Sequence, residues 1–236
     1  AVELAGGIGI LTLNRPERRN ALSVEMRREI MTCMGKWRES PTVGVMIITG
    51  AGEAFTAGFD LTEFSRPELY SEIFETSSAY HRELWNFPKP TIAAVNGPAL
   101  AGGFDLAKLC DIRICSPKAV FGHPEIKFGI PPLMTPLRWI IGEGPARHLC
   151  LTGKRVDAME AFRIGLVSEV VDAEKLLERA VKIATEILET PLEALKRTKQ
   201  LMIGVSGLGF EESFCMEHDR IFQEYLLKKA SESAKK

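Results

Sequence analysis

Short apolar segments alternate with helical patterns through the first two thirds of the chain, and few folds accommodate that order. Largely apolar runs occupy residues 8–13, 43–49, 91–95 and 112–115. Runs of this kind are typical of strands that are covered on both faces of a sheet. Helical patterns at 24–37 and in a segment that ends near Trp85 lie between them. The alternation predicts an α/β fold.

From Asp157 onward the pattern becomes helical. Helical patterns cover residues 157–163, 174–189, 192–202 and 210–229, and the last carries Phe214, Ile221, Phe222 and Tyr225 on or near one side. Such an apolar stripe either folds back on its own core or packs against another subunit. We therefore expect a core with the functional site over residues 1–156 and a helical C-terminal region over residues 157–236.

Composition and charge argue against two classes of partner. The 30 Lys and Arg residues balance 31 Asp and Glu residues, without the basic excess or stripe of a nucleic-acid-binding protein. No apolar stretch approaches the roughly 20 residues of a membrane span, and the first residues are typical of a strand and not of a signal peptide. The five scattered cysteines favour free thiols in a reducing compartment. We expect a soluble, cytoplasmic protein that binds neither nucleic acid nor membrane.

A glycine-rich turn at residues 96–105, NGPALAGGFD, follows one predicted strand and begins a helix. Glycines leave backbone N–H groups uncovered, and a helix N-terminus directs unpaired N–H groups outward. Such a site holds an oxyanion or a phosphate; the alternative is a turn that only packs strand against helix. A second loop, residues 54–61, also follows a strand, so both loops can meet at one sheet edge.

Two carboxylates accompany these loops. Asp105 lies just inside the helix that follows the glycine-rich turn, and Glu125 follows His123-Pro124, where proline suits the first turn of a helix. Paired carboxylates act as acid and base when their environments separate their pKa values. The alternatives are a helix-dipole partner for Asp105 and a first-turn surface acid for Glu125.

Metal chemistry finds no support in the pattern. The four histidines, His81, His123, His148 and His218, show no metal-ligand spacing, so we expect structural roles for all of them. Cys110 and Cys115 lack a second Cys/His pair. We expect no metal site.

Taken together, these residues resemble the crotonase superfamily, which comprises the enoyl-CoA hydratases and isomerases. The matching blocks, in chain order, are LTLNRP at 11–16 with NAL at 20–22, then residues 54–61, 90–111 and 121–129, and LTG at 151–153 with GLV at 165–167. The resemblance covers nearly the whole chain. It implies a spiral of β-β-α units followed by C-terminal helices that build a homotrimer or hexamer.

The resemblance also implies a substrate site for an acyl-CoA. The backbone N–H groups of Phe59 and Gly102 would form an oxyanion hole. Ala57, Asp60 and Leu61 would line the substrate site together with these two residues. Coenzyme A would enter as part of the substrate, so no separate cofactor is expected.

Catalytic roles follow from the same resemblance. Glu125 matches the acid/base that transfers a proton at the α-carbon, and Asp105 matches the second carboxylate, a Glu in hydratases, that helps activate water. Arg15 and Arg19 would lie near the nucleotide phosphates. These matches imply an enoyl-CoA hydratase.

Two departures from the family pattern keep alternatives open. Asp105 is one methylene shorter than the usual Glu, and residues 130–136, IPPLMTP, are apolar where typical hydratases are glycine-rich. The segment is compatible with an isomerase that uses Glu125 alone, or with a bulky or cyclic acyl group. Leu133 occupies the position where dienoyl-CoA isomerases and the related dehalogenase carry a required Asp, which argues against both activities. A non-catalytic acyl-CoA-binding subunit is the third hypothesis.

Overall fold

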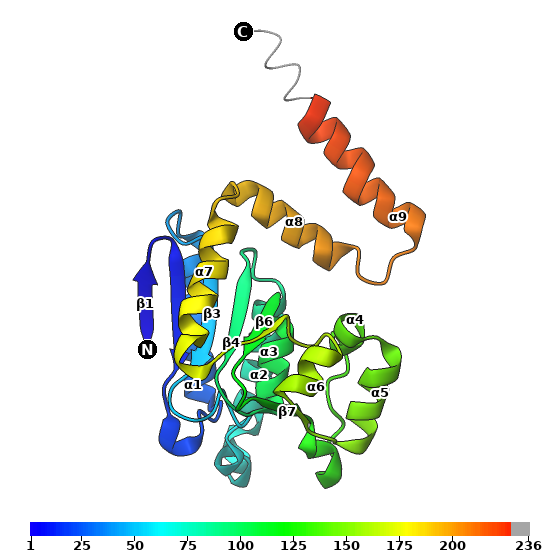
Figure 1. Cartoon of the computed structure of the whole chain (residues 1–236). Coiled ribbons are helices and arrows are strands. Elements are labelled where there is room, and N and C mark those ends of the chain that lie inside the picture. Colours follow the sequence, from blue (N-terminus) through cyan, green and yellow to red (C-terminus); the bar gives the residue numbers. More distant parts are fainter. Residues whose placement is uncertain (228–236) are drawn as a thin grey trace. The chain divides into compact units, whose positions relative to one another are not determined.

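The computed structural model describes residues 1–227, apart from the side chain of Tyr225 (Figure 1). The chain divides into two compact units, one from Ala1 to Thr190 and one that begins at Pro191. No helix in the described part of the chain is long and apolar enough to cross a membrane.

The first unit is built around a six-stranded sheet with strand order β1-β2-β3-β4-β6-β9. Its strands are β1 (Val2–Ala5), β2 (Ile8–Leu13), β3 (Val45–Gly50), β4 (Thr91–Val95), β6 (Ile112–Cys115) and β9 (Glu169–Val170). β1 pairs with β2 in the antiparallel sense, and every other pair is parallel. Parallel neighbours need crossover connections, which explains the helices between the strands.

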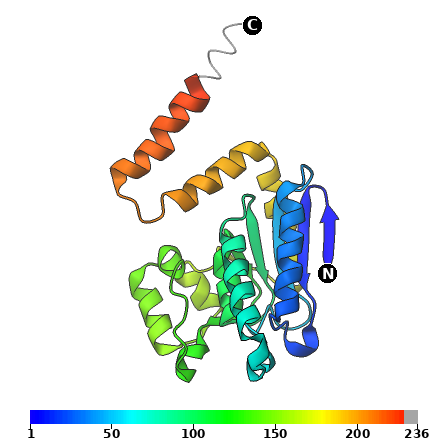
Figure 2. The same cartoon turned by 180° about the vertical axis from the view of Figure 1, so that it is seen from behind.

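Helices cover both faces of this sheet, as the apolar strand sequences require. Helix α7 (Leu176–Leu188) lies on one face, and α1 (Val24–Glu39), α2 (Tyr70–Trp85) and α3 (Gly102–Leu109) lie on the other (Figure 2). Val45 and Ile47 of β3 belong to the apolar core between the sheet and α7. Met46 and Ile48 belong to the core on the opposite face of the sheet. The period of two in a strand thus divides one apolar run between two cores.

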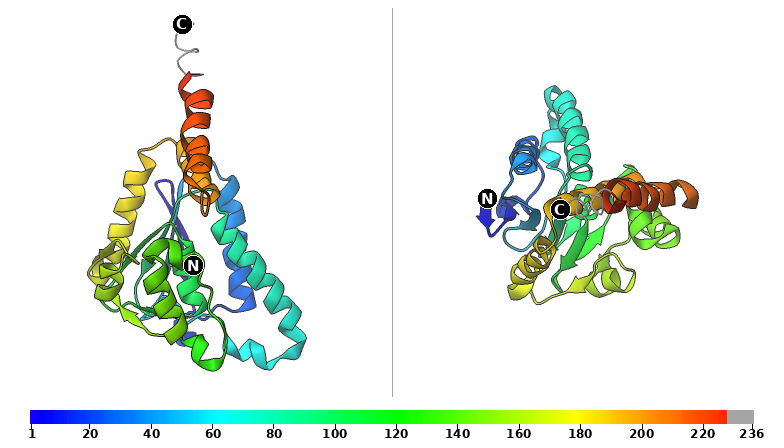
Figure 3. Two further views of the ribbon diagram at one scale, coloured as in Figure 1. Left: turned by 90° about the vertical axis from the view of Figure 1, so that its right-hand side faces the viewer. Right: turned by 90° about the horizontal axis from the view of Figure 1, so that it is seen from above.

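On the face opposite α7, helix α1 has a side-chain N-cap and packs beside α2. Helix α1 begins after Ser23, whose side chain accepts a hydrogen bond from the Met26 N–H, as N-cap serines do. α1 and α2 run side by side (Figure 3). Arg38 of α1 and Glu83 of α2 form an ion pair across them at 2.5 Å.

A smaller sheet makes the chain a spiral. It contains β5 (Ala99–Leu100), β7 (Val120–Gly122) and β8 (Val156–Asp157), in the order β5-β7-β8. Parallel bridges continue it, since Thr56 pairs with Ala99 and Leu22 pairs with Phe59. Each turn of the chain therefore places one strand in the large sheet and a second extended segment in the small one.

Shorter elements complete the first unit. A 3₁₀ helix at Pro124–Phe128 follows β7. Three α-helices come after it, α4 (Leu137–Ile141), α5 (Glu143–Thr152) and α6 (Ala158–Arg163). Asp157 caps α6 by accepting a hydrogen bond from the Glu160 N–H.

The second unit is helical. Helix α8 (Leu192–Gly204) is followed by α9 (Phe210–Phe214), which continues as π-helical turns at Cys215–Asp219 and Phe222–Leu227. Phe210, Phe214, His218 and Phe222 stack in succession along one side, with ring centroids 4.6–5.7 Å apart. Phe214 and Phe222 of the predicted stripe therefore share one side. The Tyr225 side chain, Lys228 and Lys229 lie outside what the structure describes.

The predicted division of the chain at residue 157 differs from the one in the structure. β9 pairs with β6, and α7 packs on β3 and β4, so residues 157–190 belong to the first compact unit. The apolar face of α7 already had a partner in the sheet, which its helical pattern alone did not reveal. That the helical region forms a trimer stays a prediction.

Candidate active site

Three successive turns of the spiral bring the predicted site together. Phe59 follows the extended segment at Thr56, Gly102 follows β5, and Glu125 follows β7. These segments are neighbours in the small sheet, because Thr56 pairs with Ala99 and Ala99 pairs with Phe121. The two loops that the sequence placed at one sheet edge do lie side by side.

The Phe59 and Gly102 amides form a pair of available donors. Leu22 donates its N–H to the Gly58 carbonyl at 2.8 Å and accepts from the Asp60 N–H at 3.4 Å. Because backbone groups alternate along an extended chain, the Phe59 N–H between them faces away from Leu22. A Cβ placed on Gly102 would lie 3.6 Å from the Phe59 nitrogen, so the two backbones are adjacent. Within residues 1–227, neither amide donates a hydrogen bond.

Special backbone conformations create this pair. Gly58 has φ +97°, and a Cβ there would lie 2.8 Å from the Leu100 carbonyl oxygen and 3.1 Å from the Gly102 nitrogen. Ala101, just before α3, has φ 50° and ψ −125°, a conformation that side-chain-bearing residues rarely adopt. Strain of this kind persists where the surrounding structure holds it, and functional sites are common locations for it.

Asp105 lies in the first turn of α3 with its carboxylate buried among cationic and basic groups. Its Oδ1 atom is 2.7 Å from the Lys108 ammonium and 3.9 Å from His123 Nε2, and its Oδ2 atom is 3.9 Å from His81 Nε2. The Lys108 contact is close but lacks hydrogen-bond direction. Burial raises the pKa of Asp105, but His81, Lys108 and His123 more than offset it, and the pKa falls below its usual value.

Glu125 lies in the 3₁₀ helix after β7, with one carboxylate oxygen held and the other free. Its Oε1 atom is 2.7 Å from His123 Nδ1. Its Oε2 atom is buried and has no hydrogen-bond partner among the described residues. A buried, unpaired carboxylate oxygen costs free energy unless something else binds it, so this atom is available to a substrate or a water molecule.

The prediction of structural roles for all four histidines missed the contacts of two of them. His123 contacts Glu125 at 2.7 Å and Lys108 at 3.0 Å, and His81 lies 3.9 Å from Asp105. The sequence carried a partial signal, because Lys108 is three residues after Asp105 on one helix face and His123 is two residues before Glu125. No cluster of three or more potential metal ligands was found in the part of the chain that the structure describes.

The remaining predicted substrate residues differ in what they can offer. Ala57 and Leu61 are exposed, with Leu61 75% accessible. The Asp60 carboxylate is buried and occupied, since it accepts hydrogen bonds from Thr62 and pairs with Arg15 at 3.1 Å. Burial raises the pKa of Asp60, but these bonds reverse the effect and leave it below its usual value. Its side chain therefore braces the loop, and Arg15 is engaged in the same brace.

The segment after Glu125 carries exposed apolar side chains. Phe128, Ile130 and Leu133 are 82%, 56% and 40% accessible. The Leu133 carbonyl accepts a hydrogen bond from Lys108, so this segment is fixed to α3 next to the carboxylates. A run of this composition offers an acyl group an apolar surface.

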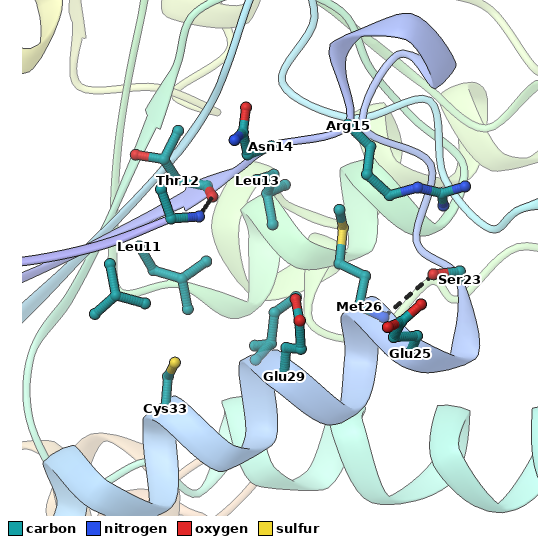
Figure 4. Close-up of a pocket in the computed structure, with 13 residues that line it drawn as sticks. Leu11, Thr12, Leu13, Asn14, Arg15, Ser23, Glu25, Met26, Glu29 and Cys33 are labelled. Atoms are coloured by element: carbon teal, nitrogen blue, oxygen red, sulfur yellow. Dashed lines mark hydrogen bonds between the residues drawn. The ribbon is translucent and has the colours of Figure 1, made fainter.

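A separate pocket of about 440 Å³ opens between the N-terminal strands and α1 (Figure 4). Glu25, Glu29, Met26 and Cys33 line it from α1, and Leu11 and Leu13 line it from β2. It includes Arg15 but none of the two carboxylates, two amides or two histidines described above. The candidate catalytic groups therefore lie outside this pocket.

Comparisons with known proteins agree on one family. The Enoyl-CoA hydratase/isomerase family profile matches residues 3–232. A putative enoyl-CoA hydratase of Thermus thermophilus is 37% identical over 217 residues, covering 89% of this chain and 85% of that protein. A hydroxycinnamoyl-CoA hydratase-lyase of Pseudomonas fluorescens is 38% identical over 208 residues, covering 84% and 75%.

Solved structures give the same result. The crystal structure of an enoyl-CoA hydratase from Bacillus anthracis superposes with a TM-score of 0.89 at 32% identity, covering 93% of this chain and 88% of that one. The spiral, the paired sheets and the order of the sequence blocks all fit this likeness. The chain belongs to the enoyl-CoA hydratase/isomerase family, within the crotonase superfamily.

Proposed function

We propose that this chain is an enoyl-CoA hydratase that adds water across the double bond of a 2-enoyl-CoA thioester. The observation that carries the proposal is the buried Oε2 atom of Glu125, which has no hydrogen-bond partner among the described residues. It lies in the same site as the Asp105 carboxylate and as the Phe59 and Gly102 N–H groups, which donate no hydrogen bond there. Relatives at 37% and 45% identity are named enoyl-CoA hydratases, which supports the same activity.

The reaction adds one water with no other reactant. The water oxygen bonds to the β-carbon and one of its O–H bonds breaks. Glu125 takes that proton at Oε2 and delivers it to the α-carbon, while Asp105 accepts a hydrogen bond from the other O–H and orients the attack. Electron density from the double bond moves to the thioester oxygen and returns when the α-carbon is protonated.

The amides of Phe59 and Gly102 would stabilise the enolate-like oxygen between those steps. Fixed donors need no reorganisation when charge develops, and loss of one typically costs about 3 kcal/mol of transition-state stabilisation. Coenzyme A would act as a handle whose remote binding energy positions the acyl group. No resident cofactor is needed, because water and the thioester supply every atom.

The acyl group is proposed to be larger than a short straight chain. The apolar residues Phe128, Ile130 and Leu133 support this, as does the name of the Pseudomonas relative, which specifies a hydroxycinnamoyl group. The same segment favours a second candidate, an isomerase in which Glu125 alone moves a proton between the α- and γ-carbons.

We also propose a homotrimer, alone or paired into a hexamer, assembled through the helical C-terminal region. The exposed side chains of Phe210, Phe214 and Phe222 support such packing. A reducing, cytoplasmic location is supported by five cysteines that form no disulfide in the described residues. Nucleic acid and membranes are not proposed as partners.

Product analysis tests the activity. The protein is incubated with 2-enoyl and 3-enoyl thioesters of coenzyme A, with straight and aromatic acyl groups, in water enriched in ¹⁸O. Hydration adds one labelled water to the product mass, whereas isomerisation leaves the mass unchanged and moves the double bond. Binding without turnover of any thioester would contradict both activities and favour a non-catalytic acyl-CoA-binding protein.

Variants assign the roles. Glu125→Gln should lower kcat by about 10²–10⁴-fold, the usual range for loss of a general acid/base. Asp105→Asn should slow hydration while leaving exchange of the product's α-proton with deuterated solvent measurable. Glu143→Gln is the matched control, because Glu143 is an exposed acid that pairs only with Arg138 and Arg147 among the described residues.

A further inference from the structure

A buried lysine joins the two carboxylates of the site. Lys108 lies three residues after Asp105 on α3, and its side chain is fully buried. Its ammonium is 2.7 Å from Asp105 Oδ1 and 3.0 Å from His123 Nε2. His123 Nδ1 in turn is 2.7 Å from Glu125 Oε1. The order Asp105, Lys108, His123, Glu125 is thus a continuous chain of close polar contacts.

The hydrogens of this chain match its acceptors in one arrangement. A lysine ammonium carries three N–H donors, and Lys108 is within hydrogen-bonding reach of His123 Nε2 and the Leu133 carbonyl while it forms an ion pair with Asp105 Oδ1. His123 must then present a lone pair at Nε2 and a proton at Nδ1. That proton points to Glu125 Oε1, so Oε1 must act as the hydrogen-bond acceptor. A doubly protonated His123 would set two donors against each other at 3.0 Å.

Other titratable groups face this cluster from α2 and α5. Tyr80 and His81 come from α2, and Cys150 comes from α5. Burial raises the pKa of both the Tyr80 phenol and the Cys150 thiol, so both stay uncharged at neutral pH. The groups that favour ionised Asp105 are therefore His81, Lys108 and His123, and Lys108 is the one with a direct contact at 2.7 Å.

We infer that Lys108 is a positioning residue that holds Asp105 ionised as a hydrogen-bond acceptor for water and, through His123, orients Glu125 with Oε2 toward the substrate. The inference rests on the proposed hydratase function. Two carboxylates that share a site otherwise share a proton, because repulsion raises one of their pKa values. With Lys108 beside it, Asp105 stays ionised and is left to orient the water, while the unpartnered Oε2 atom of Glu125 is left to transfer the proton.

The lowered pKa of Asp105 fits this division of roles. An ion-paired carboxylate is a weak base, so Asp105 can bind a water hydrogen without keeping it. Glu125 has one oxygen in contact with His123 Nδ1, and its Oε2 atom has no hydrogen-bond partner among the described residues, so Oε2 is free to receive the proton. The shorter side chain of Asp105 also agrees, since it leaves the carboxylate within reach of Lys108 on the same helix.

The test is the pH profile of kcat/KM for Lys108→Met, a substitution of similar length that removes the charge. We expect the acidic limb to move upward by about 1–2 pH units, since an adjacent opposite charge lowers a carboxyl pKa by that order. KM for the thioester should change little. Lys118→Met, at an exposed lysine, is the control and should leave the profile unchanged. In an Asp105→Asn background, Lys108→Met should shift the limb much less.

A second pair of variants tests the histidine. The side-chain amide of His123→Asn keeps a donor near the position of Nδ1, whereas His123→Leu has none. We expect His123→Asn to retain at least tenfold more kcat than His123→Leu. Nitrogen NMR of ¹⁵N-labelled histidine supplies a readout without turnover, and His123 should carry its proton at Nδ1 in the parent protein and lose that preference in Lys108→Met.

These measurements separate the two ideas. A hydratase whose Lys108→Met variant is slower by one factor at every pH, with the His123 tautomer unchanged, would overturn the inference and leave the activity standing. A parent protein that hydrates no thioester would overturn the proposed function. In that case the His123 nitrogen resonances still decide whether Lys108 fixes the tautomer.

Discussion

The guanidinium carbon of Arg27 lies 4.6 Å from the centre of the Phe59 ring, and Arg27 Nη1 donates to the Leu22 carbonyl at 2.8 Å. Leu22 is the residue that pairs with Phe59 across the parallel bridge. A single buried cation therefore holds both the ring of Phe59 and the segment that fixes its backbone. Thr76 Oγ1 accepts from Nε and Nη2 on the opposite side, so the group is held from both ends.

Replacing Arg27 should loosen the Phe59 amide. Arg27→Met removes a cation–π contact, worth about 2 kcal/mol when desolvated, and leaves the Leu22 carbonyl with one donor fewer. We expect kcat to fall about tenfold or more, with a smaller change in KM, in steady-state hydration assays. Arg28→Met is the matched control. Arg28 is next to Arg27 on α1, but it is exposed and pairs only with Glu72 among the described residues. Equal losses in both variants would contradict a role for Arg27 at Phe59.

Gly58→Ala should close the space between the two amides. Its Cβ would lie 2.8 Å from the Leu100 carbonyl oxygen, in a backbone conformation that alanine resists. We expect at least a hundredfold loss of kcat/KM, since misplacement of one donor has that effect. Gly165→Ala has a similar φ of +75° but open space at the Cβ, so it measures the backbone cost alone. Comparable activity in the two alanine variants would show that the contact at Leu100 is unimportant.

Asp105 should make stability depend on acid pH. Its folded-state pKa is below the usual 3.8, so ionised Asp105 contributes stability above that value. The contribution is lost as the pH falls through the folded-state pKa. Asp105→Asn leaves Lys108 without its counter-charge and should cost about 3–5 kcal/mol near neutral pH. Urea unfolding between pH 3 and 7 should show this difference shrinking toward the acid end, and a difference independent of pH would argue against the ion pair.

Asn20 should be intolerant of a charge. It is fully buried, and its Nδ2 donates to the carbonyls of Ala51 and Ala54 while its Oδ1 accepts from the Arg15 N–H. Asn20→Asp replaces the two-donor group with an acceptor that faces two carbonyls, so we expect at least about 2 kcal/mol of destabilisation. Thermal or urea unfolding measures it. Asn14→Asp, at an exposed asparagine nearby, should change stability by less than about 0.5 kcal/mol.

Local pattern was enough for most elements of the core. The strands predicted at 8–13, 91–95 and 112–115 occur at those residues, because each is a largely apolar run that ends at a turn residue. Helices α4 and α5 were not predicted. They are short, and Pro136 and Gly142 interrupt the region in which they lie. Their formation depends on packing of Leu137 and Ala146 into the core, which no local period reports.

The site shows the same limit more sharply. Gly102, Asp105 and Glu125 could be named as candidates because a glycine turn and two acids follow successive strands and match the family pattern. Lys108 and His123 were not, since a lysine within a helix is ordinarily an exposed charge. Their roles depend on the distance between α3 and the segment after β7, which is a property of the folded spiral. Only the three-dimensional contact turns these two residues into a link between carboxylates.

The pairing of Leu100 with Gly122 in the small sheet has a consequence for how such a chain can diverge. Gly102 follows one of these strands by two residues and Glu125 follows the other by three, and the Ala101 N–H reaches the Gly122 carbonyl at 3.0 Å. Strand spacing of about 4.8 Å therefore sets the separation of Glu125, the proposed acid/base, from Gly102, the proposed oxyanion donor. Descendants of this sequence can exchange the side chains of residues 128–136, and with them the acyl group they accept. The separation of Glu125 and Gly102, by contrast, is inherited with the backbone.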